Sequence, residues 1–184
     1  MSRILVADDD RVVLFGLAEG LRGAGFDVIE ARDGDEALAL CRSQAPDLAM
    51  LDIRMPGLDG LELAKALREQ TSVPFLFLSA YSDVELVKRA VAIGALGYLV
   101  KPLDVGAIVP SLRTALARAA DLAGLRYALE SNRTIATAVG VLMARENSDQ
   151  QAAVERLRAL ARNQRRRMED VARKLVDDED LGKP

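Results

Sequence analysis

The sequence predicts an α/β fold for the first part of the chain, followed by a smaller all-α part. Up to about residue 104, apolar runs of four to six residues alternate with segments whose apolar residues recur at helical spacing. Runs with few polar residues are typical of a parallel sheet covered by helices on both faces. Beyond residue 104 only the helical period continues. We therefore expect a doubly wound sheet of five parallel strands, a long linking helix and a small module of three helices.

Five apolar runs mark the expected strands, at residues 4–7, 26–31, 48–51, 75–79 and 97–100. The segments between them carry apolar residues at helical spacing, beginning with Leu14, Leu17 and Leu21. Five such units in about a hundred residues fit a doubly wound domain.

The composition excludes several kinds of chemistry. The 184 residues contain one cysteine, Cys41, and no histidine. A lone cysteine cannot form an internal disulfide and usually behaves as a small buried hydrophobic residue. The lack of histidine excludes Ser-His and Cys-His catalysis and His-ligated zinc. There is no signal-like start and no apolar run near the roughly 18 residues of a membrane span. We therefore expect a soluble cytoplasmic protein with no membrane partner.

The net charge of −3 is unevenly distributed. Residues 1–104 carry 11 Lys and Arg against 17 Asp and Glu, whereas residues 105–176 carry 13 against 7. The last eight residues are acidic again and are expected to form a solvated tail. The reversal suggests two modules with different partners, although charged helix faces also produce such a split.

Polar side chains follow four of the expected strands. Asp8 and Asp9 come after the first, Asp52 after the third, Ser79 at the end of the fourth and Lys101 after the fifth. Ligands of such sheets bind at the carboxyl ends of the strands. The sequence therefore predicts one site where three carboxylates, a hydroxyl and an ammonium converge.

These groups suit the transfer of a phosphoryl group. Asp8, Asp9 and Asp52 offer the hard oxygen ligands that Mg²⁺ prefers. When the metal ion neutralises the neighbouring carboxylates, one carboxylate is able to attack phosphorus and become an aspartyl phosphate. Ser79 is placed to hydrogen-bond one phosphoryl oxygen, and Lys101 to pair with another.

The three consecutive carboxylates at residues 8–10 also permit an enzymatic interpretation. Asp8 and Asp10 have the spacing of the nucleophile and acid/base pair of haloacid-dehalogenase-type phosphatases. That family needs a further pair of acidic residues after the lysine, here Lys101, to hold Mg²⁺. Only Asp104 is available before the next helix. It would also leave Asp52 without a role, so we expect no enzyme. Asp10 is instead expected to start the first helix, a position that Asp favours.

Residues 1 to about 120 resemble a two-component response-regulator receiver domain, which has a CheY-like, flavodoxin-like fold. The stretches ILVADDD, LDIRMPGLDG, PFLFLSA and AIGALGYLVKP carry the resemblance in order and spacing. It implies that a sensor histidine kinase phosphorylates Asp52. It also implies that Mg²⁺ is held by Asp8, Asp9, Asp52 and the backbone carbonyl of Arg54.

The same resemblance assigns roles to other residues around the phosphoacceptor. Ser79 and Lys101 would hold the phosphoryl group. Tyr98 would change rotamer together with Ser79 on activation. Arg54 and Tyr81 occupy positions that tune the lifetime of the phosphate in this family.

A long helix is expected from Val105 to about Leu129. Positions 108, 112, 115, 119, 122, 126 and 129 follow alternating steps of four and three, and all but Arg126 are apolar. This seam suits a short coiled coil between two chains. The alternative is that its first half packs on the sheet, so that only the part past about residue 119 is available for pairing.

The stretch at residues 130–132 is expected to end this helix, with Ser131 or Asn132 capping the next one. Helices are predicted at residues 133–145, 149–162 and 165–177, with Glu-Asn-Ser-Asp supplying the break and the cap between the first two. Residues 133–176 carry 10 Lys and Arg against 5 Asp and Glu and no aromatic residue. A basic unit of this kind suits nucleic acid, but its charge could equally be a solvated face.

This last segment resembles the ANTAR domain, the AmiR and NasR transcription antitermination regulator module. The matching stretches are A-x-G-V-L-M, A-x-x-x-L-R and V-A-x-x-L-V. The resemblance implies that a dimer binds an RNA hairpin in a nascent leader and prevents a terminator from forming. Many members carry Lys where this chain has Val139. The expected RNA contacts are therefore Arg133, Arg145, Arg162, Arg165, Arg166, Arg173 and Lys174.

Taken together, the expected organisation is a receiver domain at residues 1–120, a helical linker at 105–131, an ANTAR domain at 132–178 and an acidic tail at 179–184. The expected function is phosphorylation-dependent antitermination, with homodimerisation through the long helix on activation. The alternatives are a response regulator with a DNA-binding helix-turn-helix output, and one whose C-terminal helices bind only protein.

Overall fold

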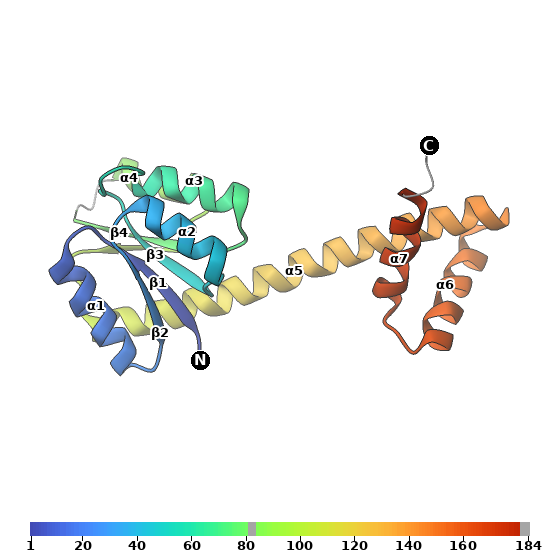
Figure 1. Ribbon diagram of the computed structural model, residues 1–184, viewed down its shortest axis with the longest axis horizontal. Coiled ribbons are helices and arrows are strands. Elements are labelled where there is room, and N and C mark those ends of the chain that lie inside the picture. The colour runs from blue at the N-terminus through green and yellow to red at the C-terminus, as the bar shows by residue number, and fades with distance from the viewer. Residues whose placement is uncertain (81–83, 181–184) are drawn as a thin grey trace. The chain divides into compact units, whose positions relative to one another are not determined.

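The computed structural model describes residues 1–80 and 84–180 (Figure 1). The chain divides into two compact units, the first from Met1 to Asp121 and the second starting at Leu122.

The first unit is built on one sheet of five parallel strands, which confirms the predicted fold class. The strands are β1 (Arg3–Ala7), β2 (Asp27–Ala31), β3 (Leu48–Asp52), β4 (Phe75–Ser79) and β5 (Tyr98–Val100), in the order β2-β1-β3-β4-β5. Because the strands are parallel, their carboxyl ends meet at one edge of the sheet.

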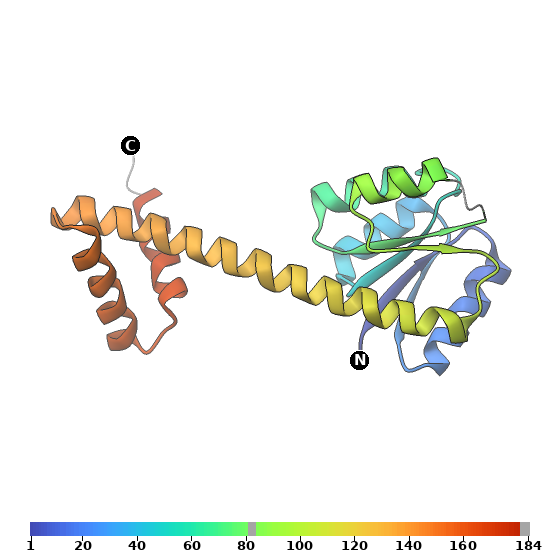
Figure 2. The same cartoon turned by 180° about the vertical axis from the view of Figure 1, so that it is seen from behind.

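Helices cover both faces of the sheet (Figure 1). One face carries α1 (Arg11–Gly23) and the first turns of α5 (Val105–Glu146). The other carries α2 (Gly34–Gln44), α3 (Gly60–Gln70) and α4 (Val84–Ile93). Figure 2 shows the same two layers from behind.

The strands send alternate side chains into the two layers. In β1, Ile4 and Val6 pack with α1 and α5, while Leu5 and Ala7 pack toward α2 and α3. Strands β3 and β4 are buried along their whole length. This explains their continuous apolar runs, because a strand that is covered on both faces has no solvent-facing position. Burying each large side chain contributes about 1.5–3 kcal/mol.

Short polar side chains start the helices next to the carboxyl edge. Asp10 caps α1 by accepting hydrogen bonds from the backbone N–H groups of Val12 and Val13, as expected. Asp59 and Glu62 form a reciprocal capping box at the start of α3. These caps fix where the loops that follow β1 and β3 must end.

The predicted helix break at residues 130–132 is wrong, because α5 runs without interruption from Val105 to Glu146. Ser and Asn in a helix interior destabilise the helix by only tenths of a kcal/mol. Tertiary contacts can therefore determine whether the helix continues through these residues. Ser131 does not cap a new helix; its hydroxyl donates to the Glu169 carboxylate, 2.9 Å away. In the first half of α5, Ile108, Leu112 and Ala115 pack on the sheet, as the alternative interpretation of the seam expected.

The second unit contains the end of α5, α6 (Gln150–Gln164) and α7 (Met168–Asp180), which pack together in both views (Figures 1 and 2). Its core gathers Ala138, Val139, Leu142, Ala153, Leu157, Ala161, Val171 and Ala172. Asp149 caps α6, as predicted. The last helix begins three residues later than predicted, because Arg165 adopts a left-handed φ of 51° that ends α6.

Among residues 1–80 and 84–180, no helix combines the length and apolarity needed to cross a membrane.

Candidate functional site

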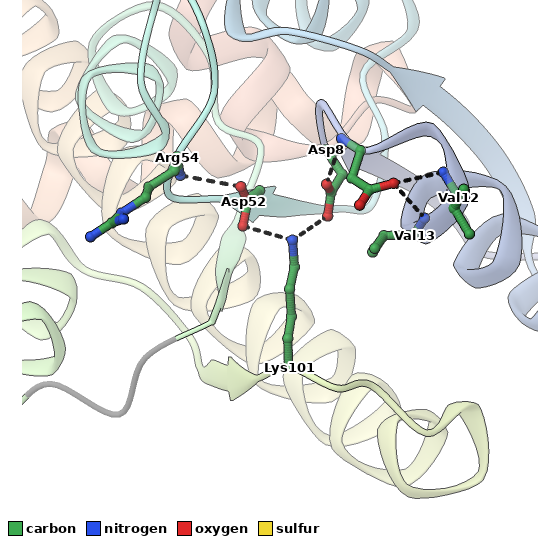
Figure 3. A network of polar contacts seen from close by, with 7 residues as sticks. Asp8, Val12, Val13, Asp52, Arg54 and Lys101 are labelled. Atoms are coloured by element: carbon green, nitrogen blue, oxygen red, sulfur yellow. Dashed lines mark hydrogen bonds and ion pairs between the residues drawn. The ribbon is translucent and has the colours of Figure 1, made fainter.

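Four polar groups predicted from the sequence meet at the carboxyl edge of the sheet, and Figure 3 shows three of them, Asp8, Asp52 and Lys101. Asp8 directly follows β1, Asp52 ends β3, and Lys101 directly follows β5. The nearest carboxylate oxygens of Asp8, Asp9 and Asp52 lie within 4.8 Å of one another. Asp8 and Asp52 are buried, whereas Asp9 is exposed at the mouth of the site.

The Lys101 ammonium bridges the two buried carboxylates. Its Nζ lies 2.6 Å from Oδ2 of Asp8 and 3.0 Å from Oδ1 of Asp52. The contact with Asp8 is an ion pair by distance, although Asp8 Oδ2 accepts no regularly oriented hydrogen bond from the described residues. The Lys101–Pro102 peptide bond is cis. The backbone N–H of Lys101 donates to the carbonyl of Ser79 at 2.7 Å.

The electrostatics of the site reflect a balance between burial and pairing. Burial raises the pKa of Asp52 above its ordinary value, and the Lys101 ammonium opposes that rise. Burial by itself would lower the pKa of Lys101, but its contacts with Asp8 and Asp52 together outweigh this effect and raise it. Lys101 therefore remains an ammonium at neutral pH.

The donor set fits a hard divalent cation. Three carboxylates face one another with one ammonium among them, so the cluster carries excess negative charge. Mg²⁺ prefers a few carboxylate oxygens and retains waters on its remaining positions. The carboxylates of Asp8, Asp9 and Asp52 are thus close enough to share an ion.

The other predicted residues lie on β4, on β5 and shortly after β3. Ser79 is buried at the end of β4, and Tyr98 begins β5 and is partly buried. The backbone N–H of Arg54 donates to Oδ2 of Asp52 at 3.2 Å, so the peptide of Arg54 adjoins the carboxylate. Tyr81 lies outside the described residues.

The residues predicted to contact RNA all belong to the second unit and are exposed. They lie on α5 (Arg133 and Arg145), at the end of α6 (Arg162), in the turn that follows (Arg165 and Arg166) and on α7 (Arg173 and Lys174). Within the described ranges, none of these seven side chains forms an ion pair.

The arginines that the prediction left out behave differently. Arg156, Arg158 and Arg167 pair with Glu146, Glu155 and Glu169 respectively. Val139, at the position where many ANTAR domains carry Lys, is buried in the core of the unit. An apolar residue suits that environment.

The sequence did not reveal two further relationships. Gly60 packs against the backbone of Asp52, where an added β-carbon would stand 2.1 Å from the Asp52 carbonyl oxygen. Glu169 collects hydrogen bonds from Tyr127 and Ser131, which joins α7 to α5. The Asp-Gly pair at residues 59 and 60 was a local sequence signal for the contact between Gly60 and Asp52. No local sequence signal indicated the hydrogen bonds to Glu169.

Two family models match the chain, one for each part. The response regulator receiver domain matches residues 4–113, and the ANTAR domain matches residues 123–176.

Curated relatives share one or both parts. The transcriptional regulatory protein PdtaR of Mycobacterium tuberculosis is 32% identical over 190 residues, covering 99% of this chain and 92% of that protein. The DNA-binding response regulator MtrA of Mycobacterium leprae is 38% identical over 117 residues. That match covers 64% of this chain and 52% of MtrA, so it spans only about half of that relative.

Solved receiver structures superpose on the first part of the chain. Chemotaxis protein CheY4 of Vibrio cholerae matches with a TM-score of 0.60 at 33% identity, covering 62% of this chain and 98% of that one. The receiver domain of Francisella response regulator 1452 matches with a TM-score of 0.61 at 32% identity, covering 64% and 98%.

Proposed function

The chain belongs to the response regulators that join a receiver domain to an ANTAR domain, and from this premise we propose that it is a phosphorylation-controlled antiterminator that binds RNA hairpins as a dimer. It is a two-component response regulator with an ANTAR RNA-binding output, and hence a regulatory rather than an enzymatic protein. Its receiver domain implies a phosphodonor such as a histidine kinase.

Asp52 is the proposed phosphoacceptor. One of its carboxylate oxygens attacks phosphorus, and an acyl phosphate bond forms as the bond from phosphorus to the donor breaks. Its place at the end of β3, between Lys101 and the peptide of Arg54, supports this assignment. A histidine donor then leaves with the electron pair of the broken bond on its ring nitrogen.

Mg²⁺ is the proposed cofactor, held by Asp8, Asp9, Asp52 and the backbone carbonyl of Arg54. When bound, the ion neutralises the approaching phosphoryl oxygens. The short distances among the three carboxylates support this ligand set. Lys101 then pairs with a phosphoryl oxygen, and the hydroxyl of Ser79 donates to another.

Activation is proposed to pass through Ser79 and Tyr98. In the present structure Lys101 is held between two carboxylates. A phosphoryl group on Asp52 adds negative charge next to that ammonium, so Lys101 and Ser79 turn toward it. Tyr98, on the strand beside Ser79, then changes rotamer, and the long helix pairs with its copy in a second chain.

The output is proposed to be RNA binding by the seven basic residues predicted from the sequence, none of which forms an ion pair in the described part of the second unit. Arginine pairs with phosphates and stacks on unpaired loop bases. The basic surplus of residues 133–176 supports contact with a polyanion.

The observation that carries the proposal is the convergence of Asp8, Asp9, Asp52 and Lys101 in a chain whose second part matches the ANTAR domain. The test is binding of matched RNA hairpins and duplex DNA to the full chain, with and without Mg²⁺ and beryllium fluoride as a phosphoryl mimic. We expect tighter binding of RNA hairpins when the mimic is present, and no response in Asp52→Asn. A preference for duplex DNA would favour the DNA-binding alternative.

A further inference from the structure

One carboxylate on α7 collects several polar contacts. The carboxylate of Glu169 accepts hydrogen bonds from the hydroxyl of Tyr127 and from the hydroxyl of Ser131, 2.9 Å away, both on α5. The guanidinium of Arg167 lies 3.6 Å from the same carboxylate. The Glu169 side chain is only 16% exposed, whereas that of Arg167 is 78% exposed. Because hydrogen bonds to an ionised group are strong and directional, these contacts hold the start of α7 on α5.

The turn between α6 and α7 consists of three arginines, residues 165–167, which we call the arginine turn. The backbone N–H groups of Arg165 and Arg166 donate to the carbonyls of Arg162 and Ala161 at the end of α6, both at 3.1 Å. On the other side, the carbonyl of Arg167 accepts from N–H groups in the first turn of α7. The arginine turn is therefore fixed at both ends, and its direction depends on where α7 starts.

The first residue of the arginine turn has an unfavourable backbone conformation. Arg165 has a φ of 51°, in the left-handed region. A residue with a β-carbon is disfavoured there, and helices that end in this way usually carry glycine at this position. The side chains of Arg165 and Arg166 are exposed, and neither forms an ion pair within the described part of the chain. A charged residue kept in a strained conformation suggests that its charge has a function.

We propose that Glu169 is a positioning residue for RNA binding, which holds the arginine turn so that Arg165 and Arg166 point toward the phosphates of one hairpin. This inference rests on the RNA output in the proposed function and names a residue that supports it. Guanidinium groups bind phosphates through paired hydrogen bonds and so require a defined direction. A turn that the fold has already ordered loses less conformational freedom on binding than a mobile one.

The charge of Glu169 is compatible with this role. An isolated carboxylate next to the RNA would repel phosphates, but Arg167 lies beside it and offsets its charge. This pairing also explains why Arg167 differs from Arg165 and Arg166. Its guanidinium is engaged with α7, while the other two remain available to a polyanion.

Neutral variants of the two hydroxyl donors test the proposal, because they leave the net charge of the chain unchanged. Tyr127→Phe and Ser131→Ala each remove one hydroxyl that donates to Glu169. Thr134→Val is the matched control, since the Thr134 hydroxyl donates within α5, to the carbonyl of Glu130 at 3.0 Å. The probe is one RNA hairpin selected from a randomised pool by the wild-type full chain. Its affinity is measured over a range of salt concentrations with Mg²⁺ and beryllium fluoride present, and circular dichroism checks the fold.

We expect Tyr127→Phe and Ser131→Ala together to weaken hairpin binding about tenfold, and Thr134→Val to bind as the wild type does. The salt dependence of affinity should not change in the hydroxyl variants, because the arginines still reach the phosphates once they have been ordered. Arg166→Ala removes a proposed phosphate contact, so it should also reduce the salt slope by about 1. Wild-type affinity in both hydroxyl variants would overturn the positioning role.

A double-mutant comparison separates positioning from general stabilisation. In a chain that already carries Arg165→Ala and Arg166→Ala, loss of the two hydroxyls should change hairpin affinity less than about twofold, since positioning acts only through the arginine turn. A further loss equal to that in the wild-type background would show that Glu169 supports the unit in general. That result would overturn the proposal.

Arg165→Gly gives an independent measurement. Glycine tolerates the left-handed conformation, so the melting temperature should not fall, whereas hairpin affinity should fall at least about threefold through the loss of a charged contact. A lower melting temperature with unchanged affinity would show a purely structural role for Arg165 and overturn its place in the proposal.

Failure of this inference can be distinguished from failure of the proposed function. If the wild-type chain selects no RNA hairpin, the RNA output itself is wrong. If Arg166→Ala weakens binding while the hydroxyl variants bind normally, RNA binding stands and only the role of Glu169 is overturned.

Discussion

Gly60, the first residue of α3, lies against the phosphoacceptor candidate Asp52: a β-carbon on Gly60 would stand 2.1 Å from the Asp52 backbone oxygen. The N–H of Gly60 also donates to the carbonyl of Ile53 at 3.1 Å. The start of α3 therefore sets the position of the end of β3.

Gly60→Ala should displace Asp52 and slow its phosphorylation severalfold. The clash involves backbone atoms rather than a flexible side chain, so we also expect a stability loss of about 1–3 kcal/mol. The measurement is the rate of phosphorylation by a small-molecule donor, together with chemical denaturation. Gly16→Ala is the matched control, because an added β-carbon there meets nothing within 4 Å. Wild-type phosphorylation in Gly60→Ala would show that the contact does not position Asp52.

The neighbouring residues Asp9 and Asp10 should respond differently to removal. Asp10 caps α1 through the N–H groups of Val12 and Val13, so Asp10→Ala should cost about 1 kcal/mol and leave phosphorylation largely intact. Asp9→Ala removes a proposed Mg²⁺ ligand and should reduce phosphorylation strongly at low Mg²⁺. Mg²⁺ titrations of the phosphorylation rate compare the two variants. Equal losses in both would contradict the separate roles.

Lys101→Met should destabilise the chain when Mg²⁺ is removed by chelation. The ammonium balances two buried carboxylates at 2.6 and 3.0 Å, and removing one partner of such a group costs on the order of 2–4 kcal/mol. Mg²⁺ should then stabilise the variant more than it stabilises the wild type, because the ion supplies the missing positive charge. Thermal unfolding over a range of Mg²⁺ concentrations measures this difference. The prediction fails if Mg²⁺ raises both melting temperatures equally.

Glu169 should make the attachment of α7 sensitive to acid. Hydrogen bonds from Tyr127 and then Ser131 lower the pKa of Glu169 below its ordinary 4.5. A carboxyl with a lowered pKa stabilises the folded state above its unfolded pKa, and that contribution is lost as the pH falls through the folded value. Acidification below about pH 4.5 should therefore reduce amide protection in α7 in the wild type.

Glu169→Gln should lack this pH-dependent contribution and show weaker protection in α7 at neutral pH. Hydrogen exchange, corrected for intrinsic rates at each pH, is the measurement. Glu155→Gln is the control, since among the residues that the structure describes Glu155 pairs only with exposed Arg158 on its own helix. Loss of protection in α7 to the same extent in both variants would argue against a specific role for Glu169.

The sequence by itself determined the sheet and the location of the candidate site. The spacing of the apolar residues and the length of the apolar runs predicted the strands of the first unit, because a strand buried on both faces must be apolar throughout. The carboxyl ends of those strands then had to share one edge, so Asp8, Asp52 and Lys101 could be placed together before any distance was known. The cap at Asp10 also followed from local chemistry.

Only the tertiary structure decided the continuity of α5 and the row of residues that α5 exposes. Ser131 and Asn132 alter helix stability by amounts too small to settle whether the helix ends there. Ser131 instead donates to Glu169, 38 residues further along the chain, and this contact with α5 forms only after α7 has folded back. The local sequence does not predict that contact. Which residues of α5 are exposed could therefore be identified only from the packed second unit, which shows the side of α5 that is covered.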